Sequence, residues 1–207
     1  MFKRITLLLL AFSLQSLFSQ SKFLLLMGPS GTGKSTIIRH LKELDQRFVY
    51  VTPLTTRELR EGEQDKVHVS IDEINALDSA GKLLTINNIY GIYYATPKQI
   101  IDDTLAQEKF PILDWPIEKL EIMEKTYGKQ LYKAYIQPDD LKELQRRLLQ
   151  DSRDKDGKRY KAGIQEINDC ISGKYDKLLD LKLVNQKDCD KEIAKSIYLR
   201  FLSSLND

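Results

Sequence analysis

The sequence is poor in the residues that build disulfide scaffolds and metal clusters. It has two cysteines, Cys170 and Cys189, and two histidines in 207 residues. The cysteines lack the close spacing of a zinc site, so they are either buried thiols or one disulfide. The chain also lacks an excess of charge of one sign, because 32 basic and 30 acidic residues are interspersed along it. This balance argues against a basic face, so we expect no nucleic-acid partner.

Long apolar runs are absent except at the N-terminus, where Lys3 and Arg4 precede apolar residues 5–18 and small Ser19 follows. This order is typical of a secretory signal peptide. The run is shorter than the roughly 20 apolar residues that a membrane span requires. Two interpretations stay open: a leader that exports or anchors the protein, or a spurious extension of a cytoplasmic protein. We expect residues 1–20 to be separate from a domain at 21–207, with no stable membrane association unless the leader is retained.

The rest of the chain alternates between short apolar runs and helical patterns. The full chain of 207 residues, 42% of them hydrophobic, is long enough to bury the core of one α/β domain. The spacing predicts helices between strands at residues 23–27, 48–51, 83–86, 110–114, 131–136 and 181–184. Strands that alternate with helices indicate a parallel sheet covered on both faces.

A phosphate-binding loop follows the first of these strands. Residues 28–35 match the pattern G-x-x-x-x-G-K-[ST], in which the glycines let backbone N–H groups face phosphate oxygens. We expect Lys34 to reach the β and γ phosphates and the Ser35 hydroxyl to hold Mg²⁺. The ATP-binding set is Gly28, Pro29, Ser30, Gly31, Thr32, Gly33, Lys34, Ser35 and Thr36. ATPases, GTPases and kinases share this loop, so the reaction must be inferred from other residues.

A second motif lies about twenty residues beyond the loop. Thr55-Thr56-Arg57-x-x-Arg60-x-Gly62-Glu63 resembles the T-T-R-x-x-R-x-G-E segment of the guanylate kinases. Weaker similarity continues in the same order through residues 70–73, 93–96 and 112–114. The resemblance implies a P-loop NTPase-type parallel sheet flanked by helices, with an acceptor-binding insert at about 53–97 and a lid at about 147–162.

The same resemblance implies the activity. Guanylate kinases transfer the γ-phosphoryl group of ATP to a nucleoside monophosphate, GMP or dGMP, with Mg²⁺. The expected partners are therefore small nucleotides, and the oligomeric state, monomer or homodimer, stays open.

Roles for individual residues also follow from the resemblance. Arg57 and Arg60 would grip the acceptor phosphate, for which bidentate guanidinium groups are suited. Tyr94 and Thr96 would contact the acceptor nucleotide. Asp114, at the end of its strand, would lie near Mg²⁺ as a catalytic and metal-binding residue.

Two arginines match the lid of the family, where they close over the ATP phosphates. Arg147 and Arg159 are these candidates and are assigned a catalytic role together with Lys34 and Asp114. Arg153 is a third, looser candidate. Lids of this kind exclude water from phosphoryl transfer.

The positions that read the guanine base depart from the family pattern. Pro53 and Leu54 replace small hydroxyl residues, Thr85 replaces a guanine-reading glutamate, and Pro116 replaces a second aspartate. Threonine cannot accept both N–H groups of guanine as a carboxylate does, so acceptor selectivity should change. Another acceptor, such as a ribose phosphate, is one alternative. A binding module of the same fold is another, although the intact phosphate loop argues against it.

Overall fold

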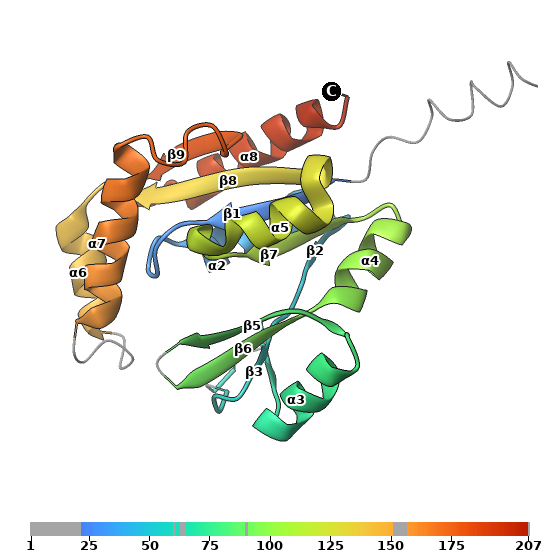
Figure 1. Cartoon of the computed structure of the whole chain (residues 1–207). Helices are drawn as coiled ribbons and strands as arrows, with labels where there is room; N and C mark the ends of the chain where they lie inside the picture. Colours follow the sequence, from blue (N-terminus) through green and yellow to red (C-terminus); the bar gives the residue numbers. More distant parts are fainter. Residues whose placement is uncertain (1–21, 60, 63–64, 90, 151–156, 207) are drawn as a thin grey trace, which may run out of the picture.

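The computed structural model describes residues 22–59, 61–62, 65–89, 91–150 and 157–206 (Figure 1). Arg60, Glu63 and Arg153 therefore lie outside the described residues. The main sheet has five parallel strands in the order β2-β7-β1-β8-β9. Their bounds are β2 Phe48–Tyr50, β7 Phe110–Asp114, β1 Phe23–Met27, β8 Leu131–Pro138 and β9 Leu181–Asn185. The predicted parallel sheet is confirmed.

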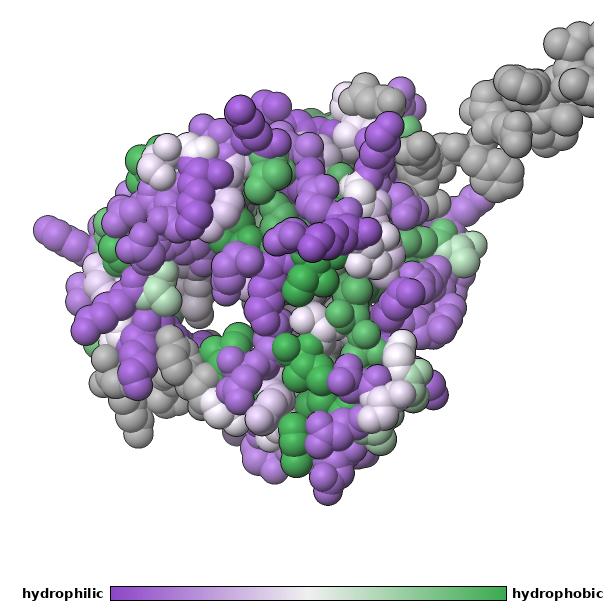
Figure 2. Space-filling view, in the orientation of Figure 1, coloured by the Kyte–Doolittle hydropathy of each residue, from purple (hydrophilic) through white to green (hydrophobic). Residues whose placement is uncertain are grey.

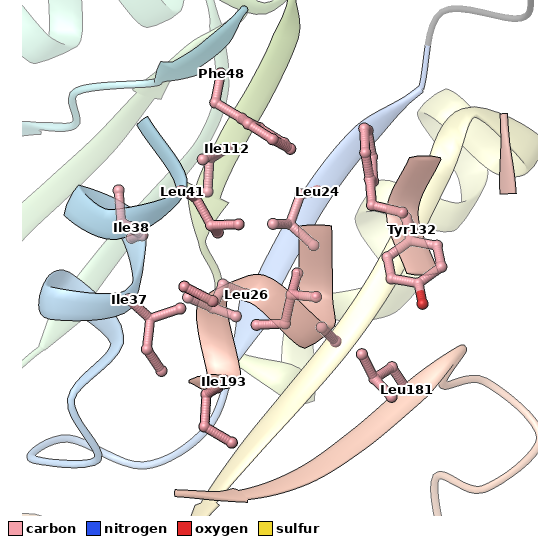
Figure 3. Close-up of a cluster of buried hydrophobic side chains, with 14 of the residues drawn as sticks. Leu24, Leu26, Ile37, Ile38, Leu41, Phe48, Ile112, Tyr132, Leu181 and Ile193 are labelled. Atoms are coloured by element: carbon pink, nitrogen blue, oxygen red, sulfur yellow. The ribbon is translucent and has the colours of Figure 1, made fainter. Parts of the chain in front are cut away.

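Helices cover both faces of this sheet. Every side chain of β1 is buried, as expected for a central parallel strand. On one face Leu24 and Leu26 pack against α2 (Lys34–Leu44) and α8 (Asp190–Ser204), as Figure 3 shows for Ile37, Leu41 and Ile193. This packing anchors the helix that begins at the phosphate loop.

The opposite face of β1 packs against a second set of helices. Phe23, Leu25 and Met27 contact residues of α4 (Lys98–Ala106) and α5 (Leu120–Tyr127). Cys170, from α7 (Lys158–Ile171), is buried in the same cluster. Both cysteines are free thiols and are not joined in a disulfide; Cys170 is buried as expected, whereas Cys189 is only half-buried.

A second sheet of four strands, in the order β4-β3-β6-β5, lies apart from the main sheet (Figure 1). Its bounds are β4 Val67–His68, β3 Leu54–Thr55, β6 Ile92–Pro97 and β5 Leu83–Ile89. Only a strand at 83–86 was expected here. Pairing across the sheet stabilises β3 and β4, which have two residues each and carry no local pattern of their own.

Helix α3 (Ile71–Ser79) accompanies this second sheet. Ser70 caps it, with its side chain accepting from the Glu73 N–H while Glu73 accepts from the Ser70 N–H. Gly81, at a φ of 66°, follows its end. The capping box and the glycine stop expected from the sequence are therefore both confirmed.

Helices α6 (Leu141–Gln150) and α7 flank residues 151–156 and stand beside the carboxyl ends of the strands (Figure 1). Leu144 and Leu148 of α6 pack against Ile167 of α7. The short helices η1 (Ile117–Lys119) and η2 (Gly128–Gln130) flank α5. Among the described residues, no helix has the length and apolar content needed to span a membrane.

Candidate functional site

The phosphate loop joins β1 to α2 and is tightly enclosed. Gly28 has a φ of 136°, and a β-carbon there would lie 2.1 Å from the Ile136 carbonyl oxygen. Gly33 has a φ of 88°, and a β-carbon there would meet the side chains of Asn185 and Asp190. Both positions require glycine because they combine left-handed backbone with close approach. The backbone of the loop leads directly into the N-terminus of α2, and this combination is a favourable place to bind phosphate.

Lys34 lies over this loop with its side chain 7% exposed. Its ammonium group donates to the carbonyl oxygens of Gly28, at 2.6 Å, and Pro29, at 2.9 Å. The Asp114 carboxylate, at the end of β7, lies 3.7 Å from the same nitrogen. The structure therefore brings together two of the residues assigned to catalysis. Their position at the carboxyl ends of parallel strands is the usual place for a ligand in such sheets.

The residues assigned to Mg²⁺ suit that ion. Ser35 is in the first turn of α2, and Asp114 has a side chain 43% exposed and therefore accessible. Mg²⁺ usually takes one or two protein oxygens and keeps water and phosphate as its other ligands. Within the described part of the chain, no group of three or more His, Cys, Asp or Glu residues could hold a metal. A hydroxyl and one carboxylate need no such group.

Helices α6 and α7, where the lid is expected, both contact the phosphate loop. Arg147 of α6 donates to the Gly31 carbonyl oxygen at 3.3 Å and to the Glu143 carboxylate at 2.9 Å. In α7, a β-carbon at Gly163 would lie 3.2 Å from Cβ of Pro29, so this helix also packs on the loop. Arg159 is half-buried one turn before Gly163. Both predicted lid arginines therefore belong to helices that touch the loop.

Asn185, which the sequence did not single out, ends β9 beside the same loop. Its Nδ2 donates to the Thr32 carbonyl oxygen and to Asp190, both at 2.9 Å. Its Oδ1 is buried and has no hydrogen-bond partner among the described residues. A narrow cleft lined by Gly31, Arg147 and Asn185 opens here. The signal available from sequence was its place at the end of a strand of the parallel sheet.

The residues expected to bind the acceptor lie on β6 and on the segment between β3 and β4. Arg57 is half-buried, and its Nη1 donates to the Glu58 carbonyl oxygen at 2.7 Å. Tyr94 and Thr96 are both on β6, where Thr96 is 8% exposed. Arg60, the second predicted clamp residue, is outside the described residues. The structure thus supplies the positions of three of the four acceptor candidates.

A hollow of about 510 Å³ connects the phosphate loop with the insert. Ser35, Arg39 and Glu43 of α2 line one side, and Thr52 and Asp65 line the other. Figure 2 shows a mostly hydrophilic face, with an opening between the lid side and the second sheet. The hollow therefore runs along α2 from Ser35 of the phosphate loop to Asp65 of the insert.

Glu166 of α7 is half-buried, with the Oε1 atom of its carboxyl group fully buried, and it was not among the residues predicted from the sequence. Burial raises its pKa to about 7, the nearby Lys34 charge partly opposes this shift, and Glu118 and Asp114 add to it. The Oε1 atom of Glu166 has no hydrogen-bond partner among the described residues. A titratable group of this kind beside a phosphate loop is often functional. No sequence pattern distinguishes it from the other glutamates.

The positions that depart from the family pattern lie on the second sheet and at η1. Thr85 is half-buried on β5, opposite Thr96. Pro116 immediately precedes η1, which ends at Lys119. The Lys119 ammonium group donates to Oδ1 of Asn87 on β5. This bridge joins η1, which follows β7, to β5 of the second sheet, and no local sequence pattern indicates it.

Comparison with known proteins agrees with this arrangement. A family model described as guanylate kinase matches residues 20–195. The guanylate kinase of Carboxydothermus hydrogenoformans is 32% identical over 149 residues, which cover 69% of this chain and 72% of that protein. The Helicobacter pylori guanylate kinase is 30% identical over 188 residues, covering 88% of this chain and 86% of its own.

A solved structure shares the fold. The crystal structure of guanylate kinase from Anaplasma phagocytophilum superposes with a TM-score of 0.71 at 22% identity, covering 91% of this chain and 88% of that one. The family model and the curated relatives show that the chain belongs to the guanylate kinase family.

Proposed function

We propose that this protein transfers the γ-phosphoryl group of ATP to GMP, giving ADP and GDP. The observation that carries the proposal is the arrangement at the phosphate loop. Lys34, Asp114 and Arg147 converge on a loop whose backbone is shaped for phosphate. The names of the curated relatives favour GMP as acceptor over the ribose phosphate considered from the sequence.

On the donor side, the backbone of residues 28–36 would hold the ATP phosphates. Lys34 would exchange its bonds to the Gly28 and Pro29 carbonyl oxygens for bonds to the β and γ phosphates. Ser35 and Asp114 would hold Mg²⁺, whose charge would offset the negative charge that develops on the phosphates. Arg147 and Arg159 would supply further positive charge to the transferring group from the lid.

On the acceptor side, Arg57 and Arg60 would fix the phosphate that attacks. An oxygen of the acceptor monophosphate forms a bond to the γ-phosphorus while the bond from that phosphorus to the β,γ-bridging oxygen breaks. ADP leaves with the bridging oxygen. The protein contributes positioning and charge rather than a covalent intermediate.

The remaining proposals concern the setting of this activity. We assign residues 21–207 to one guanylate-kinase-like domain with its insert at about 53–97 and its lid at about 147–162. Small nucleotides are its proposed partners. Because the reaction consumes ATP, the proposed compartment is the cytoplasm.

A screen of ADP release with the purified chain tests the function. ATP and Mg²⁺ would be supplied with GMP, dGMP, AMP, CMP, UMP or ribose phosphates, and ADP would be measured by a coupled assay. We expect release with GMP that Lys34→Ala abolishes. Release with a ribose phosphate and none with any nucleotide would overturn the proposal, as would ATP hydrolysis that no acceptor stimulates.

A further inference from the structure

The side chain of Lys119, at the end of η1, reaches the face of the second sheet where the acceptor is expected to bind. Asn87, which accepts a hydrogen bond from the Lys119 ammonium group, is 8% exposed. Asn87 pairs with Tyr94, and Thr85 pairs with Thr96, between β5 and β6. Directly opposed residues share a face, as do residues two apart on one strand. The four side chains and the tip of Lys119 therefore gather on one face of the second sheet.

The backbone that carries Lys119 is held in place. The buried Trp115 donates from its ring nitrogen to the Lys119 carbonyl oxygen at 3.1 Å. The residue lies at the end of η1, five positions after Asp114 closes β7. Asn87 fixes the other end of the side chain. A lysine held at both ends presents its charge at a defined place, at a low further cost in side-chain entropy.

This face is rich in hydrogen-bond donors. A lysine ammonium group has three donors, and Asn87 uses one of them. The side chains of Thr85, Tyr94 and Thr96 add neutral hydroxyl groups. Such a surface suits a ligand edge that offers acceptors. The O6 and N7 atoms of a 6-oxopurine are both acceptors and are a common target of lysine, whereas adenine replaces O6 with a donating amino group.

We propose that Lys119, positioned by Asn87, determines acceptor specificity by donating to the O6 and N7 edge of a 6-oxopurine monophosphate. The inference rests on the proposed function, and it names the class of acceptor more closely. The 2-amino group of guanine is a donor on another edge of the base, and the lysine does not contact it. The enzyme therefore accepts IMP nearly as well as GMP and discriminates against AMP.

The test compares GMP, IMP and AMP with the full chain and three variants at Lys119 and Asn87. Values of kcat/KM come from ADP release, and dissociation constants for the three monophosphates come from calorimetry. In the wild type we expect the kcat/KM values for GMP and IMP to agree within about threefold, and the value for AMP to be lower. Lys119→Met should reduce the GMP-to-AMP and IMP-to-AMP ratios by roughly 10- to 150-fold, the range for one hydrogen bond to a charged group.

Two further variants separate specificity from a structural role. Lys119→Arg keeps a cationic donor and should keep most of the preference for oxopurines. Asn87→Ala releases the ammonium group of Lys119 and should reduce that preference by a smaller factor than Lys119→Met does. The KM for ATP should stay unchanged throughout. Lys125→Met is the matched control, because Lys125 is an exposed lysine that pairs with Glu121 on α5. Thermal unfolding of each variant shows that the fold is kept.

Several results would overturn the inference. One is a wild type that prefers GMP over IMP by a hundredfold, because another group would then read the 2-amino position. Another is a Lys119→Met variant in which kcat/KM falls by the same factor for GMP, IMP and AMP, because the bridge to Asn87 would then have only a structural role. Failure of the proposed function is distinct, since it would appear as no ADP release with any monophosphate. The calorimetric ratios would still decide whether Lys119 reads the base.

Discussion

The Lys34 ammonium nitrogen lies 3.7 Å from Oδ1 of Asp114, so the phosphate loop and the end of β7 meet at one point. Lys34 also donates to two carbonyl oxygens of its own loop, which hold the side chain over the place where phosphate is expected. Replacing this residue is the most direct test of the donor site.

We expect Lys34→Ala to remove nearly all phosphoryl transfer while the chain stays folded, because the ammonium group supports charge on the transferring phosphoryl group. Steady-state ADP formation measures the loss, and circular dichroism measures the fold. Lys195→Ala, on the exposed side of α8, is the matched control and should keep wild-type turnover. A Lys34→Ala enzyme with near-normal turnover would refute the donor site.

The acceptor clamp can be tested separately from the donor site. Arg57→Ala or Arg60→Ala should raise the KM for the acceptor far more than the KM for ATP. Loss of one charge-assisted contact costs about 1.5–3 kcal/mol, or roughly 10- to 150-fold. Initial rates with each substrate varied in turn measure the two constants. Arg200→Ala, at an exposed position of α8, controls for loss of an arginine. Equal increases in both constants would contradict the assignment.

The buried Glu166 carboxyl group predicts a pH dependence of stability. Its pKa is raised from 4.5 to about 7, so the folded state binds the proton more tightly than the unfolded state does. The folded state therefore loses stability as pH rises from 4.5 to about 7, and the loss is complete above pH 7. A shift of this size is worth at most about 3 kcal/mol.

Glu166→Gln should therefore lose less stability than the wild type between pH 5 and pH 8. Urea unfolding at pH 5 and pH 8 measures the change in stability of each protein. Glutamine does not titrate, so any effect of the substitution that does not depend on pH cancels when the two changes are compared. Glu192→Gln, on the exposed surface of α8, should follow the wild type. Parallel pH profiles for wild type and Glu166→Gln would show that the group does not titrate in this range.

The altered base pocket predicts a poor or relaxed GMP kinase. Thr85 and Pro116 stand where the family has carboxylates, so the guanine edge lacks its charged acceptors. Thr85→Glu combined with Pro116→Asp should improve kcat/KM for GMP relative to AMP by roughly tenfold or more. Competition between the two acceptors measures the ratio. A wild type that already prefers GMP over AMP by several orders of magnitude would show that residues beyond Lys119 read the base, and would contradict this prediction.

The sequence by itself determined the donor half of this protein. The phosphate loop, its preceding strand and its following helix are contiguous, so their pattern of glycines and apolar residues is complete within residues 23–44. The capping box of α3 is likewise local, since Ser70 and Glu73 lie within one turn. Signals of this kind can be recognised from the sequence because the interacting groups are close along the chain.

Tertiary structure alone decided the second sheet and the groups that gather around the cleft. Strands β3 and β4 exist through pairing with distant partners, which no two-residue pattern can indicate. Asn185 meets Thr32 across 153 positions, and Lys119 meets Asn87 across 32. Burial likewise gives Glu166 its raised pKa. These properties depend on which segments pack together, and packing is a property of the whole fold rather than of any local stretch.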